Sequence, residues 1–315
     1  MRITDVSPRD GLQNESGIVP AASKVDLVRA LCAARVDEVE VTSFVSPKWV
    51  PQLGDAAEVL ELLRSDCPHP SSLPEREGAG GPVYSALVPN VKGFERFVEQ
   101  HSDAFPLKAA VFTAASETFS QKNTNATIDE TVERFMAFVP RALGMGIAVR
   151  VYVSCVIACP FEGAISAEAV RGVCDRLRVL GDDEAWESGR LELDLGDTIG
   201  AGDDASVRAL LNTFDDAERS RMTLHLHDTF GRAAECVRTG LEMGVRSFDG
   251  SVAGLGGCPY AGTPEKPAPG NVSTEVVVET AEQMGFATGV DRAALAEAAA
   301  LARRIVGEAR AGAAS

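Results

Sequence analysis

The sequence predicts an α/β fold, a closed (β/α)8 or TIM barrel that is followed by an additional C-terminal helical segment. Short runs rich in β-branched residues alternate with longer helix-forming stretches, which is typical of parallel strands joined by crossover helices. The alternation occurs eight times within the 315 residues, and eight such units suit a closed barrel. A doubly wound open sheet is the alternative, because periodicity alone does not show whether a sheet closes.

The expected strands are short and rich in Val, Ile, Thr, Leu or aromatic residues. In chain order they are "RITDV" (2–6), "DEVEVTSF" (37–44), "VYSALV" (83–88), "LKAAVFT" (107–113), "AVRVYVS" (148–154), "RLELDL" (190–195), "MTLHLH" (222–227) and "VRSFDGSV" (245–252). The expected helices lie between and after them, at 21–35, 52–64, 91–100, 127–144, 166–180, 203–213, 231–243 and 272–285. The Pro-, Gly- and Ser-rich segment 68–82 is predicted to be a loop, and the alanine-rich segment 291–311 a helix. We therefore predict a single catalytic domain over 1–315, with the barrel at about 2–290.

The composition excludes several classes of partner. The formal net charge is −16, which argues against a nucleic-acid or anionic membrane surface, since both need clustered Lys and Arg. An anionic small-molecule substrate would need a local basic patch that opposes this overall charge. No apolar run is long enough to span a bilayer, and the N-terminal "MRITDVSPRD" resembles no targeting segment, so we expect a cytoplasmic protein. The seven cysteines suggest neither a disulfide framework nor a zinc site, because no second Cys/His pair complements Cys155 and Cys159.

Polar, small and Gly-rich stretches follow the expected strands. They are "PRDGLQNE" (8–15), "TSF" (42–44), "VPN" (88–90), "TAASE" (113–117), "SC" (154–155), "LGDTIG" (195–200), "HLHD" (225–228) and "SVAGLGGCPYAG" (251–262). Because the carboxyl ends of the strands of a barrel meet at one face, where barrel enzymes build their active sites, we expect an active site there.

A metal site is predicted from two histidines and one carboxylate. His225 and His227 are two residues apart in a strand, so their side chains point to the same face. The first and seventh strands flank the eighth in a closed barrel, so Asp10 can add a carboxylate. This donor set suits Mg²⁺ or Mn²⁺. The alternative is a hydrogen-bonded pair of barrel histidines without a metal.

Three further side chains have chemistry that such a site could use. Arg9 can stabilise negative charge on a substrate oxygen, or it can form a structural ion pair. Glu40 faces the barrel interior if Val39 and Val41 face the helices, and Arg9 is its candidate partner. Cys258 lies in a glycine-rich loop, where a thiol is usually inert but could protonate a carbanion.

These motifs resemble those of the hydroxymethylglutaryl-CoA lyases, within a superfamily of metal-dependent carbon–carbon lyases and condensing enzymes on TIM barrels. The resemblance covers roughly residues 2–290 and rests on "RDGLQNE", "EVTSFVSPKWVPQ", "FTAASETFSQKN", "YVSCVIACPFEG", "LGDTIG", "HLHDTFG" and "SVAGLGGCPYA", in the order of that family. It implies cleavage of 3-hydroxy-3-methylglutaryl-CoA (HMG-CoA) to acetyl-CoA and acetoacetate, as in leucine degradation and ketone-body metabolism. It also implies a homodimer.

The resemblance implies a role for each matching residue. Metal ligands would be Asp10, His225, His227 and Asn271. Catalytic residues would be Arg9 on the substrate oxygens, Glu40 orienting Arg9, Asp197 as the base near the C3 hydroxyl, and Cys258 as the proton donor to the enolate. Substrate and CoA contacts would come from Gln13, Lys48, Lys122 and Asn123.

Several features depart from the family pattern, among them Asp194, the long segment 262–271 before Asn271 and the insertion at 68–82, and three alternative functions remain open. Asp194 stands where the family has a small hydroxyl residue, and we expect like-charge repulsion between Asp194 and Asp197 to raise the pKa of one of them. One alternative is a lyase for a longer 3-hydroxy-3-alkylglutaryl-CoA. The others are a condensing enzyme or aldolase of the same superfamily, and a scaffold that binds CoA or metal without catalysis. Retention of Arg9, Asp10, both histidines and Cys258 argues against the scaffold.

Overall fold

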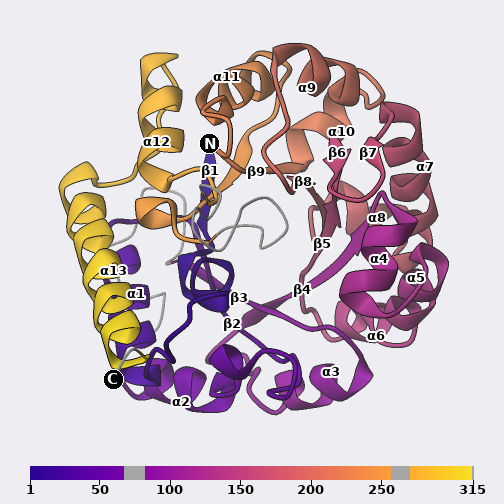
Figure 1. Ribbon diagram of the computed structural model, residues 1–315. Coiled ribbons are helices and arrows are strands. Elements are labelled where there is room, and N and C mark those ends of the chain that lie inside the picture. The colour runs from indigo at the N-terminus through magenta and orange to yellow at the C-terminus, as the bar shows by residue number, and fades with distance from the viewer. Residues whose placement is uncertain (67–81, 257–269, 314–315) are drawn as a thin grey trace.

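The strands form a closed parallel barrel (Figure 1). The computed structural model describes residues 1–66, 82–256 and 270–313. The barrel strands are β1 (Arg2–Asp5), β2 (Glu38–Ser43), β3 (Val83–Leu87), β4 (Leu107–Ala114), β5 (Val149–Ser154), β8 (Leu191–Asp197), β9 (Thr223–Leu226) and β10 (Ser247–Gly250). Because β1 pairs with both β2 and β10, the sheet closes on itself. The predicted (β/α)8 barrel is confirmed, and the open-sheet alternative is wrong.

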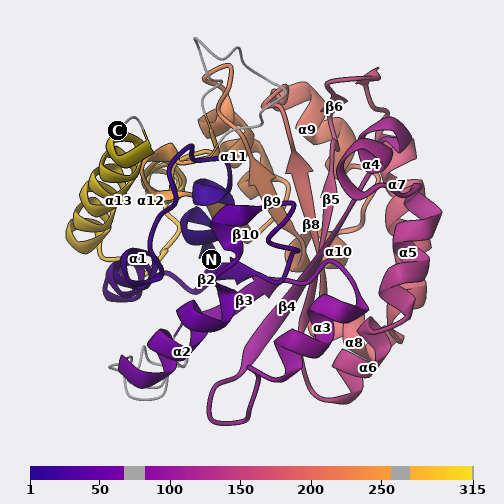
Figure 2. The ribbon, with the colours of Figure 1, turned by 60° about the horizontal axis from the view of Figure 1, so that its bottom comes forward.

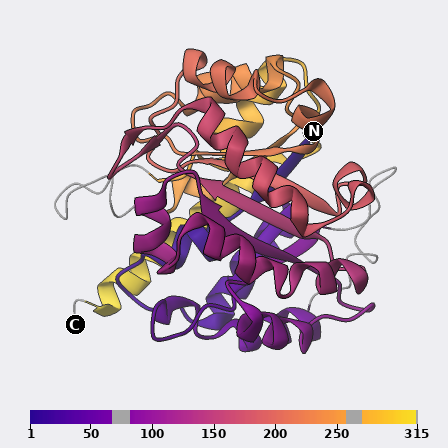
Figure 3. The same cartoon turned by 90° about the vertical axis from the view of Figure 1, so that its right-hand side faces the viewer.

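Helices surround the barrel on the outside, as Figures 1 and 3 show. The longer ones are α1 (Ala21–Ala33), α2 (Ala56–Asp66), α3 (Val91–Val98), α4 (Glu117–Thr124), α5 (Ile128–Met136), α7 (Ala167–Leu177), α9 (Asp204–Leu211), α11 (Ala233–Glu242), α12 (Thr274–Gln283) and α13 (Arg292–Ala313). The predicted C-terminal helix is α13, and it packs beside α1 (Figures 1 and 2). None of the helices in the described part of the chain is long and apolar enough to cross a membrane.

One predicted helix is divided, and several short elements were not predicted. The stretch 127–144 forms α5 and a separate α6 (Val139–Gly144), because Pro140 has no N–H to donate and starts a new helix. The unpredicted elements are α4, α8 (Asp183–Glu187), α10 (Asp216–Arg221) and a hairpin of β6 (Ala158–Cys159) and β7 (Gly163–Ala164). The predicted loop 68–82 lies outside the described residues except at its last position.

The alternation of side chains along each strand separates an apolar layer from a charged one. On β5, Val149, Val151 and Val153 belong to the hydrophobic core, whereas Arg150 and Tyr152 make polar contacts with other strands. The same alternation on β2 and β8 places Val or Leu in the core and acidic residues between them. The barrel interior is therefore lined with charged groups.

These interior charges pair with one another near the starts of the strands. The guanidinium of Arg150 is fully buried and lies 3.2 Å from Glu38, 2.8 Å from Glu192 and 3.0 Å from Asp249. Lys108 also binds Glu38, at 3.0 Å, and Glu192. Buried charges are tolerated when they are paired in this way. This network lies at the amino end of the barrel, and the cavity described below opens at the carboxyl end.

Candidate active site

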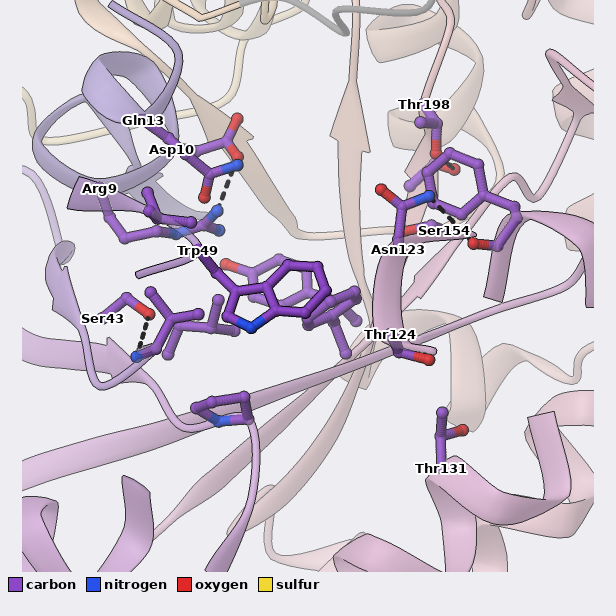
Figure 4. Close-up of a pocket in the computed structure, with 18 of the residues that line it drawn as sticks. Arg9, Asp10, Gln13, Ser43, Trp49, Asn123, Thr124, Thr131, Ser154 and Thr198 are labelled. Carbon is purple, nitrogen blue, oxygen red and sulfur yellow. Dashed lines mark hydrogen bonds and ion pairs between the residues drawn. The ribbon is translucent and has the colours of Figure 1, made fainter. Parts of the chain in front are cut away.

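The chain turns sharply after β1 through one π-helical turn, Ser7–Gly11. The N–H groups of Arg9, Asp10 and Gly11 all point at the carbonyl oxygen of Val6, at 3.2, 2.8 and 3.1 Å. Single π-turns are frequent at functional sites because they redirect side chains. Here the turn presents two adjacent charged side chains, those of Arg9 and Asp10, at the carboxyl end of the barrel (Figure 4).

Arg9 is held by carboxylates on both sides. Its Nε and Nη2 atoms lie 2.6 and 2.5 Å from Oε2 of Glu40, and its Nη1 atom lies 2.6 Å from Oδ1 of Asp10. The contact with Glu40 is the one expected from the sequence. Burial raises the pKa of Glu40, although the charge of Arg9 acts in the opposite direction. Arg9 is therefore fixed in one orientation before any substrate arrives.

Asp10, His225 and His227 form a cluster whose nitrogen and carboxylate oxygen atoms all lie within 4.8 Å of one another. The Nε2 atoms of the two histidines are 3.3 Å apart. The other ring nitrogen of His225, Nδ1, lies 3.1 Å from Oδ2 of Asp249, which leaves Nε2 facing the cluster. Burial lowers the pKa of His227 to about 4, so His227 is neutral at pH 7 and has a lone pair to offer.

Asn271 adds an amide group to the cluster. Its Nδ2 atom donates to Oδ2 of Asp10 at 2.8 Å and to the carbonyl oxygen of Leu255 at 3.1 Å. Its Oδ1 atom is buried and has no hydrogen-bond partner among the described residues. A buried acceptor of this kind needs a partner, and a cation beside Asp10 would supply one. The four side chains, Asp10, His225, His227 and Asn271, therefore fit a divalent metal ion.

Asp197 ends β8 and is directed at its own loop. Its carboxylate accepts hydrogen bonds from the backbone N–H groups of Ala201 at 3.0 Å and Gly202 at 2.7 Å. Burial raises the pKa of Asp197 to about 6. Its chain neighbours Gly196 and Thr198 line the cavity described below. The predicted role of Asp197 as a base stays a prediction.

The prediction that Asp194 and Asp197 repel each other was wrong. Asp194 and Asp197 are three residues apart in β8, so their side chains lie on opposite faces of the strand. Asp194 is fully buried in the barrel interior, where Nη1 of Arg150 lies 3.4 Å from its Oδ2 atom. Burial, and then the negative charge of Asp249, raise the pKa of Asp194. The carboxylate that acts on Asp194 is thus the one that binds His225.

A cavity of about 570 Å³ opens beside the cluster (Figure 4). Arg9, Asp10 and Gln13 lie on one side of it in this view, and Asn123, Thr124 and Thr131 lie on the other. The indole of Trp49 lies between these two groups. The cavity also reaches His225, His227, Tyr152 and Phe112. It is therefore continuous from the candidate metal ligands to the helices α4 and α5.

The far side of the cavity carries two cationic side chains, a local basic patch of the kind that an anionic substrate would need. Lys122 and Asn123 of α4 line it, as expected, together with Arg134 of α5, which the sequence did not indicate. Arg134 donates to the carbonyl oxygens of Thr124 and Asn125 at 2.9 and 3.2 Å. Its role depends on the folding of α5 against α4, and no motif in the sequence marks it.

Four of the predicted site residues in the described part of the chain do not line the cavity: Glu40, Asp197 and Asn271, which contact the residues at its edge, and Lys48. Lys48 is exposed on the loop between β2 and α2, next to residues that do line it. Cys258 falls within 257–269, outside the described residues.

Comparison with known proteins shows the family of the chain. The HMGL-like family model matches residues 1–302. The chain belongs to the HMGL-like family. It is 42% identical to the mitochondrial hydroxymethylglutaryl-CoA lyase of Bos taurus over 301 residues, which are 95% of this chain and 84% of that protein. Identity is 41% over 299 residues with the 3-hydroxy-3-isohexenylglutaryl-CoA/hydroxymethylglutaryl-CoA lyase of Pseudomonas aeruginosa, covering 95% of this chain and 90% of the relative.

Solved structures of HMGL-like proteins share the fold. The HMG-CoA lyase of Brucella melitensis superposes with a TM-score of 0.81 at 41% identity, covering 97% of this chain and 98% of that one. The family that the sequence motifs resembled is therefore confirmed.

Proposed function

We propose that this protein is a lyase that cleaves 3-hydroxy-3-methylglutaryl-CoA into acetyl-CoA and acetoacetate. The observation that carries the proposal is the group of Arg9, Asp10, His225, His227 and Asn271 at the mouth of an HMGL-like barrel. The names of the Bos taurus and Brucella melitensis relatives support the same reaction. The reaction would place the protein in leucine degradation or ketone-body metabolism.

The substrate is a tertiary alcohol with a thioester two carbons away. Its C2–C3 bond breaks when the C3 hydroxyl loses its proton: C3 becomes the ketone carbon of acetoacetate, and the electron pair passes to the enolate of acetyl-CoA. Arg9 binds the oxygen on which that enolate charge develops. Because Glu40 and Asp10 already hold its guanidinium, Arg9 needs no reorganisation during the reaction.

Asp10, His225, His227 and Asn271 would hold a divalent cation, Mg²⁺ or Mn²⁺. When bound, the cation would lower the pKa of the C3 hydroxyl and hold it close to the distal carboxylate of the substrate. Asp249 positions His225 for this role through its ring Nδ1 atom.

Two proton transfers remain. Asp197 is the candidate acceptor of the hydroxyl proton, and its raised pKa, about 6, brings it closer to the pH at which a base is effective. Cys258 is the candidate donor to the enolate carbon, which completes acetyl-CoA. Gln13, Lys122 and Asn123 of the cavity wall would bind the acyl-CoA, with Arg134 as a further cation for its phosphates and Lys48 as a more peripheral contact.

Turnover with a small set of acyl-CoA substrates tests the proposal. Protein stripped of metal with a chelator should be inactive on HMG-CoA, and added Mg²⁺ or Mn²⁺ should restore release of acetyl-CoA. If metal-loaded protein released acetyl-CoA from none of the 3-hydroxy-3-alkylglutaryl-CoA substrates, the lyase proposal would fail, and a condensing enzyme or aldolase of the same superfamily or a non-catalytic scaffold would remain.

A second candidate substrate has a longer alkyl group at C3. Leu87, Ala110 and Tyr152 form a small apolar cluster with Phe112 packed against it, and three of these four residues line the cavity. Such a wall can accept additional methylene groups, each worth about 0.8 kcal/mol when buried. The Pseudomonas aeruginosa relative is named for both substrates. The ratio of kcat/KM for the two substrates decides which is preferred.

The remaining expectations concern the domain organisation, the cellular compartment, the oligomeric state and the partners of the protein. We propose one catalytic domain that acts in the cytoplasm as a homodimer on a small-molecule acyl-CoA, without nucleic-acid or membrane partners. The acidic overall charge is consistent with the last point. Light scattering of the purified protein would give the oligomeric state.

A further inference from the structure

A fully buried lysine lies outside the candidate active site. Lys24 is in the first turn of α1, and its side chain has no exposed surface. The ammonium donates to both carboxylate oxygens of Asp55, each at 2.8 Å, and to the backbone carbonyl oxygen of Gln52. Burial disfavours a charged ammonium, so a buried lysine of this kind persists only where its partners hold it. The two residues that accept hydrogen bonds from the ammonium of Lys24, Gln52 and Asp55, lie at the end of the loop that joins β2 to α2.

Gln52 makes the reciprocal connection. Its side chain is buried, its Oε1 atom accepts from the N–H of Val19 at 2.9 Å, and its Nε2 atom donates to the carbonyl oxygen of Gly17 at 2.8 Å. Lys24 of α1 thus binds the backbone of the β2–α2 loop, and Gln52 of that loop binds the backbone of the segment that leads into α1. The two segments are joined by buried polar contacts in both directions.

Both segments form walls of the cavity. The segment that leads into α1 follows the turn of Arg9 and Asp10 and contributes Gln13 and Asn14. The β2–α2 loop, between residues 44 and 55, contributes Val45, Ser46, Trp49 and Val50. Trp49 is 75% exposed, so little protein packs against it from outside. Its position over the cavity therefore depends on the anchoring of the loop at its far end.

We propose that Lys24 is a positioning residue for substrate binding. It holds the β2–α2 loop, which places Trp49 at the cavity, against the segment that carries Gln13. Lys24 does not touch the cavity itself. Loss of its ammonium frees the loop and raises the entropy that the acyl-CoA must remove when it binds. The substrate-binding part of the proposal rests on the acyl-CoA function argued above, but the effect on the loop does not.

Kinetics of the Lys24→Met variant test the effect on binding. Methionine preserves the length of the side chain and removes the charge. The KM for HMG-CoA should rise by about five- to tenfold while kcat stays within about twofold, because the groups at the reacting atoms are untouched. Asp55→Asn, which keeps Lys24 and the shape of the loop, should shift KM in the same direction by a smaller factor. The matched control is Arg29→Met, which removes a partly exposed cation of the same helix that pairs with Asp26 and does not line the cavity, and it should change neither constant.

Fluorescence of Trp49 tests the effect on the loop without any substrate. The chain has two tryptophans, and the other, Trp186, is buried in α8, so a Trp186→Phe background isolates Trp49. In that background Lys24→Met and Asp55→Asn should raise the acrylamide quenching constant or lower the anisotropy of Trp49, and Arg29→Met should not.

The outcomes separate the two proposals. Unchanged Trp49 fluorescence together with unchanged KM in either variant overturns the role of Lys24. If Lys24→Met fails to fold, Asp55→Asn decides by the same criteria. If the parent protein shows no lyase turnover but the variants change the fluorescence of Trp49, the proposed function is contradicted and the effect of Lys24 on the loop is retained. An equal fall in kcat and kcat/KM would contradict positioning, since it indicates a loss at the transition state.

Discussion

At the scale of single residues, Asp10 connects the substrate-binding and metal-binding parts of the site. One of its oxygens contacts Arg9 and the other accepts from Asn271. Burial alone would raise the pKa of Asp10, but the charges of Arg9 and His225 outweigh burial and lower it to about 2. Asp10 is therefore an anion at every pH at which the protein would work, as a metal ligand must be.

Substitution of the two adjacent charged residues should separate their roles. Asp10→Ala should abolish turnover, because it removes the only anionic member of the donor set. It should also weaken the binding of Mn²⁺ by more than the about ten- to hundredfold that the loss of an outer partner of a ligand costs. Arg9→Ala should leave Mn²⁺ binding nearly intact and reduce kcat by about a hundred- to a thousandfold, as loss of a donor to a developing oxyanion does. Calorimetric titration with Mn²⁺, compared with turnover, gives both quantities. Loss of metal binding in Arg9→Ala would contradict this division.

The buried carboxyl of Asp197 should make stability depend on pH. Its pKa is about 6 in the folded protein, above the ordinary 3.8, so the folded state binds this proton more tightly than the unfolded state. The folded state therefore gains stability as pH falls from about 6 to about 4, by up to about 3 kcal/mol. Asp197→Asn should lose this contribution, so the difference in unfolding free energy between parent and variant should change over that pH interval. Parallel pH profiles would show that Asp197 carries no such shift.

At the scale of elements, the C-terminal helix braces the segment beside the active site. Arg310 of α13 binds Glu15 with a fork of two hydrogen bonds, at 2.8 and 2.9 Å. Gly17 lies so close to this helix that a Cβ atom there would be 1.9 Å from the carbonyl oxygen of Ala309. The helix is thus part of the support of the cavity wall.

Two glycine substitutions test this contact. Gly17→Ala should destabilise the protein by about 1–3 kcal/mol, because neither backbone can move away without separating helix and segment. Gly307→Ala in the same helix is the control: a Cβ there meets nothing within 4 Å, and alanine should stabilise an exposed helix interior by about 0.5–1 kcal/mol. Denaturant unfolding of both variants measures the change in the free energy of unfolding, which should be a loss for Gly17→Ala and a gain for Gly307→Ala. A neutral Gly17→Ala would show that α13 does not press on the segment.

The elements themselves were largely predictable, and the exceptions have local causes. The strands alternate clearly because one face packs on helices and the other holds paired charges, a pattern that survives in the sequence. The π-turn of Ser7–Gly11 could not be predicted, because it depends on one carbonyl oxygen receiving three N–H groups. The break at Pro140 could have been read from the sequence, since proline rarely continues a helix.

At the scale of the whole molecule, the candidate site was predictable to the extent that its residues lie in motifs at strand ends. Arg9, Asp10, His225 and His227 were expected together, and barrel closure brings them together. Arg134 and Lys24 were not indicated, because their contacts are with segments distant in the chain and no motif marks them. The neighbour of Asp194 was mistaken because the face of a strand, and not nearness in sequence, decides which charges meet.

The identity of the bond that breaks is the central claim, and the products formed in D₂O test it most directly. Metal-loaded protein should convert HMG-CoA into equal amounts of acetoacetate and acetyl-CoA, and the acetyl methyl group should carry deuterium from the solvent, because an enolate is protonated there. Free CoA together with intact 3-hydroxy-3-methylglutarate would show that the thioester is hydrolysed instead. That result would contradict carbon–carbon cleavage.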